Sequence, residues 1–150
     1  MSAVLGTDQV VQIGIIVKDI QVTAAKYAQF LGMEKPEISI TGTLEEASTE
    51  FRGEPSEARA KLAFFHVGPS LDIELIQPDE KPSTWREYLD EHGEGVHHIA
   101  FFIKGMKEAI IKLEGQNINL LQKGEYTGGR YAYMDSSKDL KTILELLEND

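Results

Sequence analysis

The apolar positions of this chain follow one pattern twice. Residues 12–31 and 98–117 align without a gap, and each copy begins with a β-branched, apolar run and continues with apolar side chains at helical spacing. In the first copy, Asp19 is suited to cap the start of the helix and Gly32 to end it. The chain therefore contains an internal repeat, which predicts two similar modules that share one core.

The remaining apolar runs complete each copy in the order β-α-β-β-β. In the first copy, strands are expected over residues 9–17, 36–41, 60–67 and 71–77, around a helix that follows Asp19. In the second copy, strands are expected over 96–103, 118–123, 130–135 and 141–148, around a helix over 105–115. We predict an α+β fold of one domain, in which modules 8–78 and 95–150 form a curved mixed sheet around a central cavity.

Two segments lie outside the repeat. The segment 79–94 contains Thr84-Trp85-Arg86-Glu87, whose spacing is that of a capping box, so it predicts a short linking helix. The first module is longer than the second by about 15 residues. Residues 41–58 are polar, acidic and interrupted by Gly and Pro, which makes them the best candidate for the excursion. An irregular insertion of this length is unusual unless it has a function, so we expect it to cover a site.

Four polar side chains occupy matching places in the two copies. Gln12 pairs with His98, and Glu74 pairs with Glu145. Each glutamate lies in a strongly apolar run, and a carboxylate that faces the inside of a sheet needs a cation or a proton. A single histidine in a strand is more often a core residue, but a divalent ion would balance both carboxylates with Gln12 and His98 as neutral donors. Because side chains alternate along a strand, His97 is expected to face away from His98.

This ligand set limits the chemistry. Nitrogen and oxygen donors without sulfur suit Zn, Ni, Co or Mn in an open site. Non-haem iron oxygenases prefer two histidines and one carboxylate, so Gln12 disfavours ring-cleaving dioxygenase chemistry. An open metal beside carboxylates can polarise a carbonyl while a carboxylate removes the α-proton, and returning that proton elsewhere gives isomerisation or epimerisation.

The composition of the chain disfavours some classes of binding partner. The 150 residues carry a net charge of −10, which disfavours nucleic acid, and no apolar run approaches the roughly 20 residues that span a bilayer. The absence of cysteine and of a recognisable signal sequence makes a cytoplasmic location the expectation. A small anionic substrate stays open, because a metal and local cations such as Arg59, Lys61 or Arg130 can dominate the field at short range. Gly128, Gly129 and Arg130 could line such a pocket or form a plain turn.

At these residues the chain resembles the vicinal oxygen chelate superfamily, which includes glyoxalase I, methylmalonyl-CoA epimerase, bleomycin resistance proteins and extradiol dioxygenases. The resemblance rests on the paired β-α-β-β-β modules and on ligand places in the first and last strand of each. The Gln, Glu, His, Glu set resembles glyoxalase I, in which the glutamate at the place of Glu145 is both ligand and base. The run 93–101 looks more like the epimerase, whose second catalytic acid would align near Glu57. Residues 56–59 depart from the epimerase pattern, and Gln12 replaces its first histidine.

The resemblance implies a metal-dependent lyase or isomerase of the glyoxalase (lactoylglutathione lyase) kind, acting through an enediolate. A methylmalonyl-CoA epimerase-like racemase and a non-catalytic protein that binds a small molecule such as an antibiotic are the alternatives. Glu145 would bind the metal and move the proton, with Glu57 or Glu74 as a second acid. The implied substrate is a small carbonyl compound, with CoA and glutathione thioesters or adducts among the candidates. A homodimer is expected, with the cavity formed in one chain or by exchange between two.

Overall fold

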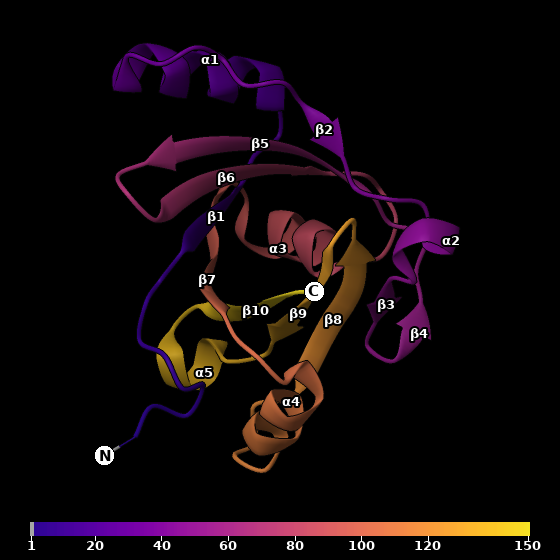
Figure 1. Cartoon of the computed structure of the whole chain (residues 1–150). Coiled ribbons are helices and arrows are strands. Elements are labelled where there is room, and N and C mark those ends of the chain that lie inside the picture. The colour runs from indigo at the N-terminus through magenta and orange to yellow at the C-terminus, as the bar shows by residue number, and fades with distance from the viewer. Residues whose placement is uncertain (1) are drawn as a thin grey trace.

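One mixed sheet of ten strands curls around a cavity in the computed structural model, which describes residues 2–150 (Figure 1). The sheet order is β2-β5-β6-β1-β7-β10-β9-β8-β3-β4. The elements are β1 (Gln12–Ile16), α1 (Ile20–Leu31), β2 (Ser39–Ile40), α2 (Leu44–Ala47), β3 (Glu50–Phe51), β4 (Glu54–Pro55), β5 (Ala60–Val67), β6 (Leu71–Pro78), α3 (Thr84–His92), β7 (Gly95–Phe102), α4 (Met106–Glu114), β8 (Leu120–Tyr126), β9 (Gly129–Met134), α5 (Ser137–Leu140) and β10 (Ile143–Asn149). The predicted α+β fold with a curved mixed sheet is confirmed.

The centre of the sheet is symmetric in its pairing. Strands β1 and β7, the first of each sequence copy, pair antiparallel to each other. Each is flanked by the last strand of its own copy, so that β6 runs parallel to β1 and β10 runs parallel to β7. The remaining strands of the sheet pair antiparallel with their neighbours. Four adjacent central strands therefore carry the four places that the repeat singles out.

Helix α1 follows the predicted boundaries. The Asp19 carboxylate accepts a hydrogen bond from the backbone N–H of Val22 at 3.2 Å, and Gly32 ends the helix in the left-handed region at φ 66°. Its buried face consists of Ile20, Ala24 and Ala28, which recur at helical spacing. Figure 1 shows α1 along β5 and β6, where these side chains meet the sheet.

Helix α3 begins one residue earlier than a capping box at Thr84 would require. Its N-cap is Ser83, whose hydroxyl accepts a hydrogen bond from the backbone N–H of Arg86 at 2.9 Å. Thr84 is instead buried, and its hydroxyl lies 3.0 Å from Nε2 of His97. The expected linking helix is present, but the threonine contacts the sheet and does not cap the helix.

The excursion in the first module is an ordered part of the wall. Residues 41–58 contain α2, β3 and β4, and β3 pairs antiparallel with β8 of the second sequence copy. The backbone N–H of Arg52 donates to the carbonyl of Leu121 at 2.9 Å, which extends the connection to the second copy. The segment therefore closes one side of the curved sheet, and Figure 1 shows α2, β3 and β4 beside β8.

Other predicted strands shift at their ends. The expected strand over 36–41 is reduced to β2, and β10 begins only at Ile143 because α5 occupies the preceding residues. Thr127 and Gly128 form the turn between β8 and β9, where Gly128 has φ 90°, and Gly129 begins β9 and lines the cavity with Arg130. Among residues 2–150, no helix is both long and apolar enough to cross a membrane.

Candidate metal centre

Four buried polar side chains meet at the centre of the sheet. Gln12, Glu74, His98 and Glu145 lie on β1, β6, β7 and β10, and none of them is more than 7% exposed. Nε2 of His98 lies 2.9 Å from Oε2 of Glu145, 3.0 Å from Oε1 of Gln12 and 3.5 Å from Oε1 of Glu74. The ligand atoms of the two glutamates and the histidine all lie within 4.8 Å of one another. The structure thus brings together every metal ligand that the sequence predicted.

The orientation of the Gln12 amide bears on what this cluster can hold. In the present orientation the amide oxygen of Gln12 faces hydrogen-bond acceptors, which include the two carboxylates. If the oxygen and nitrogen were exchanged, the nitrogen would lie 2.7 Å from Glu145 and 3.2 Å from Glu74 and could donate to both. With the oxygen inward, an amide oxygen, two carboxylates and an imidazole nitrogen converge on one point, which is the arrangement that a divalent cation requires. The donor set therefore fits a divalent ion of the Zn, Ni, Co or Mn group.

Burial shifts the pKa values of these groups in opposite directions. It raises the pKa of Glu145 to about 8, with a hydrogen bond from Tyr133 acting against the rise. The pKa of Glu74 is also raised well above its usual value, first by burial and then by the nearby charge of Glu145. Burial lowers the pKa of His98 to about 3, so its neutral form, which binds metals, prevails at neutral pH. The cluster therefore disfavours its own charges unless a cation compensates them.

A tyrosine and a tryptophan orient Glu145. The Tyr133 hydroxyl donates to the Glu145 carboxylate and accepts a hydrogen bond from Nε1 of Trp85 at 3.0 Å. Both aromatic rings are buried, and they pack edge to face with centroids 6.1 Å apart. Sequence analysis singled out neither Trp85 nor Tyr133 as a site residue, because no motif connects these residues to Glu145.

His97 does not turn away from His98, as strand alternation would require. The β1–β7 register pairs Gly14 with His98 and Ile15 with Val96, so His97 is the extra residue of a β-bulge. Both imidazoles are buried, and their Nδ1 atoms lie 2.9 Å apart. If His98 held a cation through Nε2, its Nδ1 would carry the proton and could donate to Nδ1 of His97, which would fix the ring orientation.

Gly14 makes room for His98. A Cβ atom at this position would lie 1.9 Å from Cε1 of the His98 ring. The imidazole therefore passes over the β1 backbone where only glycine permits it. A glycine inside an apolar strand is the one sequence signal that marks such an approach.

The cluster lies in a cavity of about 970 Å³ inside the curved sheet. Gln12, Glu74 and Glu145 line it together with Trp85 and Tyr133, and further residues come from α2, β5 and the β8–β9 turn. Glu57 is exposed and does not line this cavity, so the structure does not bring the proposed second acid to the cluster.

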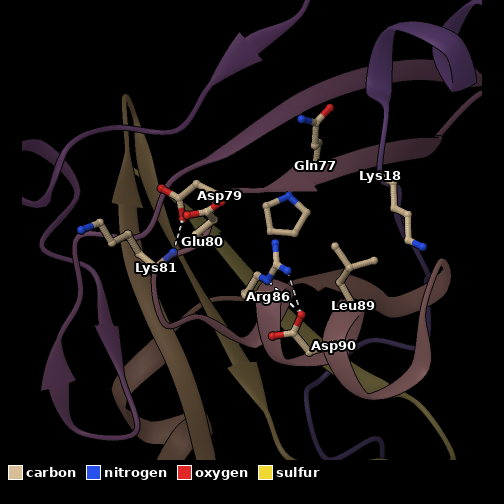
Figure 2. Close-up of a pocket in the computed structure, with 9 residues that line it drawn as sticks. Lys18, Gln77, Asp79, Glu80, Lys81, Arg86, Leu89 and Asp90 are labelled. Carbon is tan, nitrogen blue, oxygen red and sulfur yellow. Dashed lines mark hydrogen bonds and ion pairs between the residues drawn. The ribbon is translucent and has the colours of Figure 1, made fainter.

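A second hollow, of about 790 Å³, lies on another face between the end of β6 and α3. Figure 2 shows its lining, where Arg86 is paired with Asp90 at 2.9 Å and Lys18 and Leu89 lie on the opposite side from Lys81. It is more open than the central cavity and contains no buried titratable side chain. The central cavity, which contains the buried cluster, is therefore the candidate functional site.

Known proteins share this architecture. Residues 11–133 match the family model described as Glyoxalase/Bleomycin resistance protein/Dioxygenase superfamily. The uncharacterized protein YqjC of Bacillus subtilis (strain 168) is 30% identical over 95 residues, which cover 61% of this chain and 67% of that protein.

Solved structures agree on the fold. Methylmalonyl-CoA epimerase from Mycobacterium tuberculosis superposes with a TM-score of 0.66 at 20% identity, covering 100% of this chain and 92% of that chain. The Streptomyces coelicolor methylmalonyl-CoA epimerase in complex with 2-nitronate-propionyl-CoA gives 0.63 at 20% identity, with 94% and 96% covered. The extent of the family match and the agreement of the folds lead to one assignment: the chain belongs to the Glyoxalase/Bleomycin resistance protein/Dioxygenase superfamily.

Proposed function

We propose that the protein is a metal-dependent isomerase or lyase that moves a proton on the carbon next to a carbonyl group. The observation that carries the proposal is geometric: the buried side chain of Glu145 faces the cavity and lies beside Glu74, His98 and Gln12, with which it could hold a divalent ion. A carboxylate that borders both the candidate metal site and the cavity is placed to accept a proton from a carbonyl compound bound there.

Each residue of the cluster has a role in this proposal. Gln12, Glu74, His98 and Glu145 would hold a divalent ion, which supplies a Lewis acid to polarise the substrate carbonyl. Glu145 takes the α-proton, and the Tyr133 hydroxyl bonded to it keeps the carboxylate aimed at the cavity. Glu74 enters from a different strand, β6, and is suited to return the proton from another direction.

The direction of proton return separates the two reaction types. Return to the same carbon from the other side is epimerisation, and return to the neighbouring carbon is a glyoxalase-like isomerisation. The Gln12 and Glu74 pair supports the glyoxalase-like type, and the epimerase folds among the solved structures support the other. A binding protein without chemistry has no need of two buried carboxylates, because their burial costs free energy.

Proton exchange tests the proposal before the substrate is known. Zinc-loaded protein in D2O would be incubated with methylmalonyl-CoA, the hemithioacetal of glutathione and methylglyoxal, hydroxyacetone, and aminoacetone. NMR then follows replacement of the α-proton by deuterium. We expect metal-dependent exchange with at least one compound.

The variants make the test specific. Glu145→Gln keeps the shape of the side chain and should reduce exchange by at least about 100-fold, the usual contribution of a general base. Glu57→Gln is the matched control, because Glu57 is exposed and lies outside the cavity lining. Lack of exchange with all four compounds, or equal exchange in the Glu145 variant, would contradict the proposal.

A further inference from the structure

The charges around the cavity point to the kind of substrate it takes. Six carboxylates and one cation line it, the cation being Arg130; the carboxylates are those of Glu46, Asp72, Glu74, Glu125, Glu145 and Asp150. Two of the six are the candidate metal ligands, and a divalent ion would balance them. Four carboxylates then face one guanidinium, so the cavity remains acidic when the metal is bound.

The one lining cation is already paired. Arg130 donates from Nη1 to Glu148 at 2.8 Å and from Nη2 to Asp150. Both partners are carboxylates, so a carboxylate or phosphate of a substrate would have to displace them. Arg130 is therefore poorly suited to attract an anion.

The other cations considered from sequence do not line the cavity, although hydrogen bonds at the start of α2 lower the pKa of the lining residue Glu46 and the nearby charge of Arg59 lowers it further. Lys61 is exposed on β5 next to Leu62, and strand alternation directs the two side chains to opposite faces. Nε of Arg59 donates to the carbonyl of Thr41 at 2.8 Å. Neither Arg59 nor Lys61 lines the cavity, whereas Leu62 does.

Glu46 and Glu125, the two carboxylates that we call the rim of the cavity, are not engaged with charged partners in this way in the described part of the chain. Within residues 2–150, neither Glu125 nor Glu46 takes part in an ion pair, although Glu46 accepts hydrogen bonds from Thr43 at the start of α2. Aromatic side chains share the lining with them, including Phe64, Phe102 and Tyr126. Carboxylates beside aromatic faces favour a cationic group and tolerate a neutral one.

We propose that this cavity admits small carbonyl compounds that are neutral or carry an ammonium group, and that it rejects substrates with an anionic tail. The inference rests on the proposed metal-dependent function. It separates this chain from the Streptomyces coelicolor epimerase in complex with 2-nitronate-propionyl-CoA, since the phosphates of CoA are anionic and the acidic lining disfavours anions. It favours small carbonyl compounds such as hydroxyacetone and aminoacetone over the CoA and glutathione derivatives that the sequence left open.

Three hydroxamates of nearly equal length test this directly, because they share a metal-chelating group and differ in the charge of the tail. Butyrohydroxamate has a methyl tail, 3-aminopropanohydroxamate an ammonium tail, and succinic monohydroxamate a carboxylate tail. Calorimetry on zinc-loaded protein measures each dissociation constant. We expect the ammonium tail to bind at least about tenfold more tightly than the carboxylate tail, a difference of about 1.4 kcal/mol, with the methyl tail between them. The difference should shrink when salt is raised from about 0.05 M to about 0.5 M.

Two matched variants show whether the rim causes the preference. Glu125→Gln removes one cavity carboxylate and should reduce the ratio between the ammonium and carboxylate tails by about two- to threefold, the effect expected of one partly exposed charge. Glu114→Gln makes the same change in net charge on α4, away from the cavity lining, and should leave the ratio unchanged.

The outcomes separate this inference from the function on which it rests. Tighter or equal binding of the carboxylate tail overturns the inference and leaves the metal site in place. If Arg130→Gln then weakens that probe alone, Arg130 is an anion receptor after all. Failure of all three hydroxamates to bind zinc-loaded protein overturns the proposed metal-dependent function together with the inference.

Discussion

At the scale of single residues, the candidate centre depends on the lack of a side chain at Gly14 as much as on the ligands themselves. His98 reaches its partners by passing over the backbone of β1 at Gly14, where a Cβ atom would lie 1.9 Å from the ring. The backbone of β1 cannot move away easily from His98, because β1 is hydrogen-bonded to β6 on one side and to β7, which carries His98, on the other. The imidazole itself must therefore shift when position 14 gains a side chain.

We accordingly expect Gly14→Ala to damage the site before it damages the fold. Zinc affinity should fall at least about tenfold, and the free energy of unfolding by about 1–3 kcal/mol, the usual cost of overpacking. Zinc titration and urea denaturation measure the two effects. Gly115→Ala serves as the control, because Gly115 has a helical φ of −62° and a Cβ there makes only ordinary contacts. Unchanged zinc affinity in Gly14→Ala would contradict the geometry proposed for His98.

The pKa of Glu145 predicts how the metal-free protein responds to pH. A folded-state pKa of about 8 exceeds the ordinary value of 4.5, so the folded protein holds a proton that the unfolded chain has lost. The stability from this group is complete at low pH and declines as pH rises toward and through 8. Glu74 acts in the same direction, whereas the lowered pKa of His98 costs stability only below about pH 6.5.

We therefore expect the melting temperature of chelator-treated protein to fall between about pH 6.5 and 8.5, where few other groups titrate. Glu145→Gln cannot lose this proton, so its melting curve should depend less on pH in the same window. Calorimetric scans at several pH values provide the measurement. A flat profile in the native protein, or an equal slope in the variant, would be inconsistent with a protonated Glu145.

The sequence predicted some of these residues and missed others for identifiable reasons. Gln12, Glu74, His98 and Glu145 could be found because they occupy matching places in two copies of one unit. Tyr133 could not, because its role depends on which strands pair and in which register. A glycine inside an apolar strand hinted at a close approach at Gly14, but only the β1–β7 register shows that the approaching side chain is His98. The alternation rule misplaced His97 because the bulge in β7 adds one residue at that point. The roles of Gln12, Glu74, His98 and Glu145 in proton transfer and metal binding remain proposals.

At the scale of elements, α3 connects the two sequence copies and also supports the centre. Its Trp85 bonds Tyr133, its Thr84 bonds His97, and its start depends on the Ser83 cap. Sequence analysis placed the helix but chose the wrong cap, since adjacent Ser83 and Thr84 both suit that position. Only the contact of Thr84 with the sheet distinguishes them.

Loss of the cap should destabilise the helix and the molecule. Ser83→Ala removes the hydrogen bond to the N–H of Arg86 and should reduce the free energy of unfolding by about 1 kcal/mol. Urea denaturation gives the value. Ser70→Ala, in the exposed turn between β5 and β6, removes only an exposed hydrogen bond from Gln9 and should change it by less than about 0.5 kcal/mol. Equal effects of the two substitutions would count against the cap at Ser83.

The excursion over residues 41–58 has a structure that local sequence patterns did not predict. Its Gly, Pro and acidic residues predicted an irregular cover, but the segment contains α2 and a short hairpin that joins β8. The pairing of Glu50 with Lys123 and of Phe51 with Gln122 is a long-range contact that no local pattern reveals. Thr41, Gly42 and Glu46 still line the cavity, so the segment does lie at the site.

At the scale of the whole molecule, the internal repeat accounts for most of what could be predicted. It predicted two similar modules around one core and four matching ligand places, whereas the antiparallel pairing of β1 with β7 and the parallel pairing of β6 and β10 with them were found only in the structure. The family match over residues 11–133 agrees with that architecture. The division into modules at 8–78 and 95–150, the homodimer and the cellular location remain predictions from sequence.

The central claim is that four buried side chains form one divalent metal site, and metal content tests it most directly. Wild-type protein, His98→Ala and His66→Ala would be incubated with Zn, Ni, Co or Mn, dialysed against a weak chelator and measured by elemental analysis. His66 is the matched control, since its side chain is 81% exposed and pairs with Asp72. We predict about one ion per chain in the wild type and in His66→Ala, and none in His98→Ala with its circular dichroism spectrum retained. Absence of all four metals from the wild type, or full retention by His98→Ala, would contradict the account.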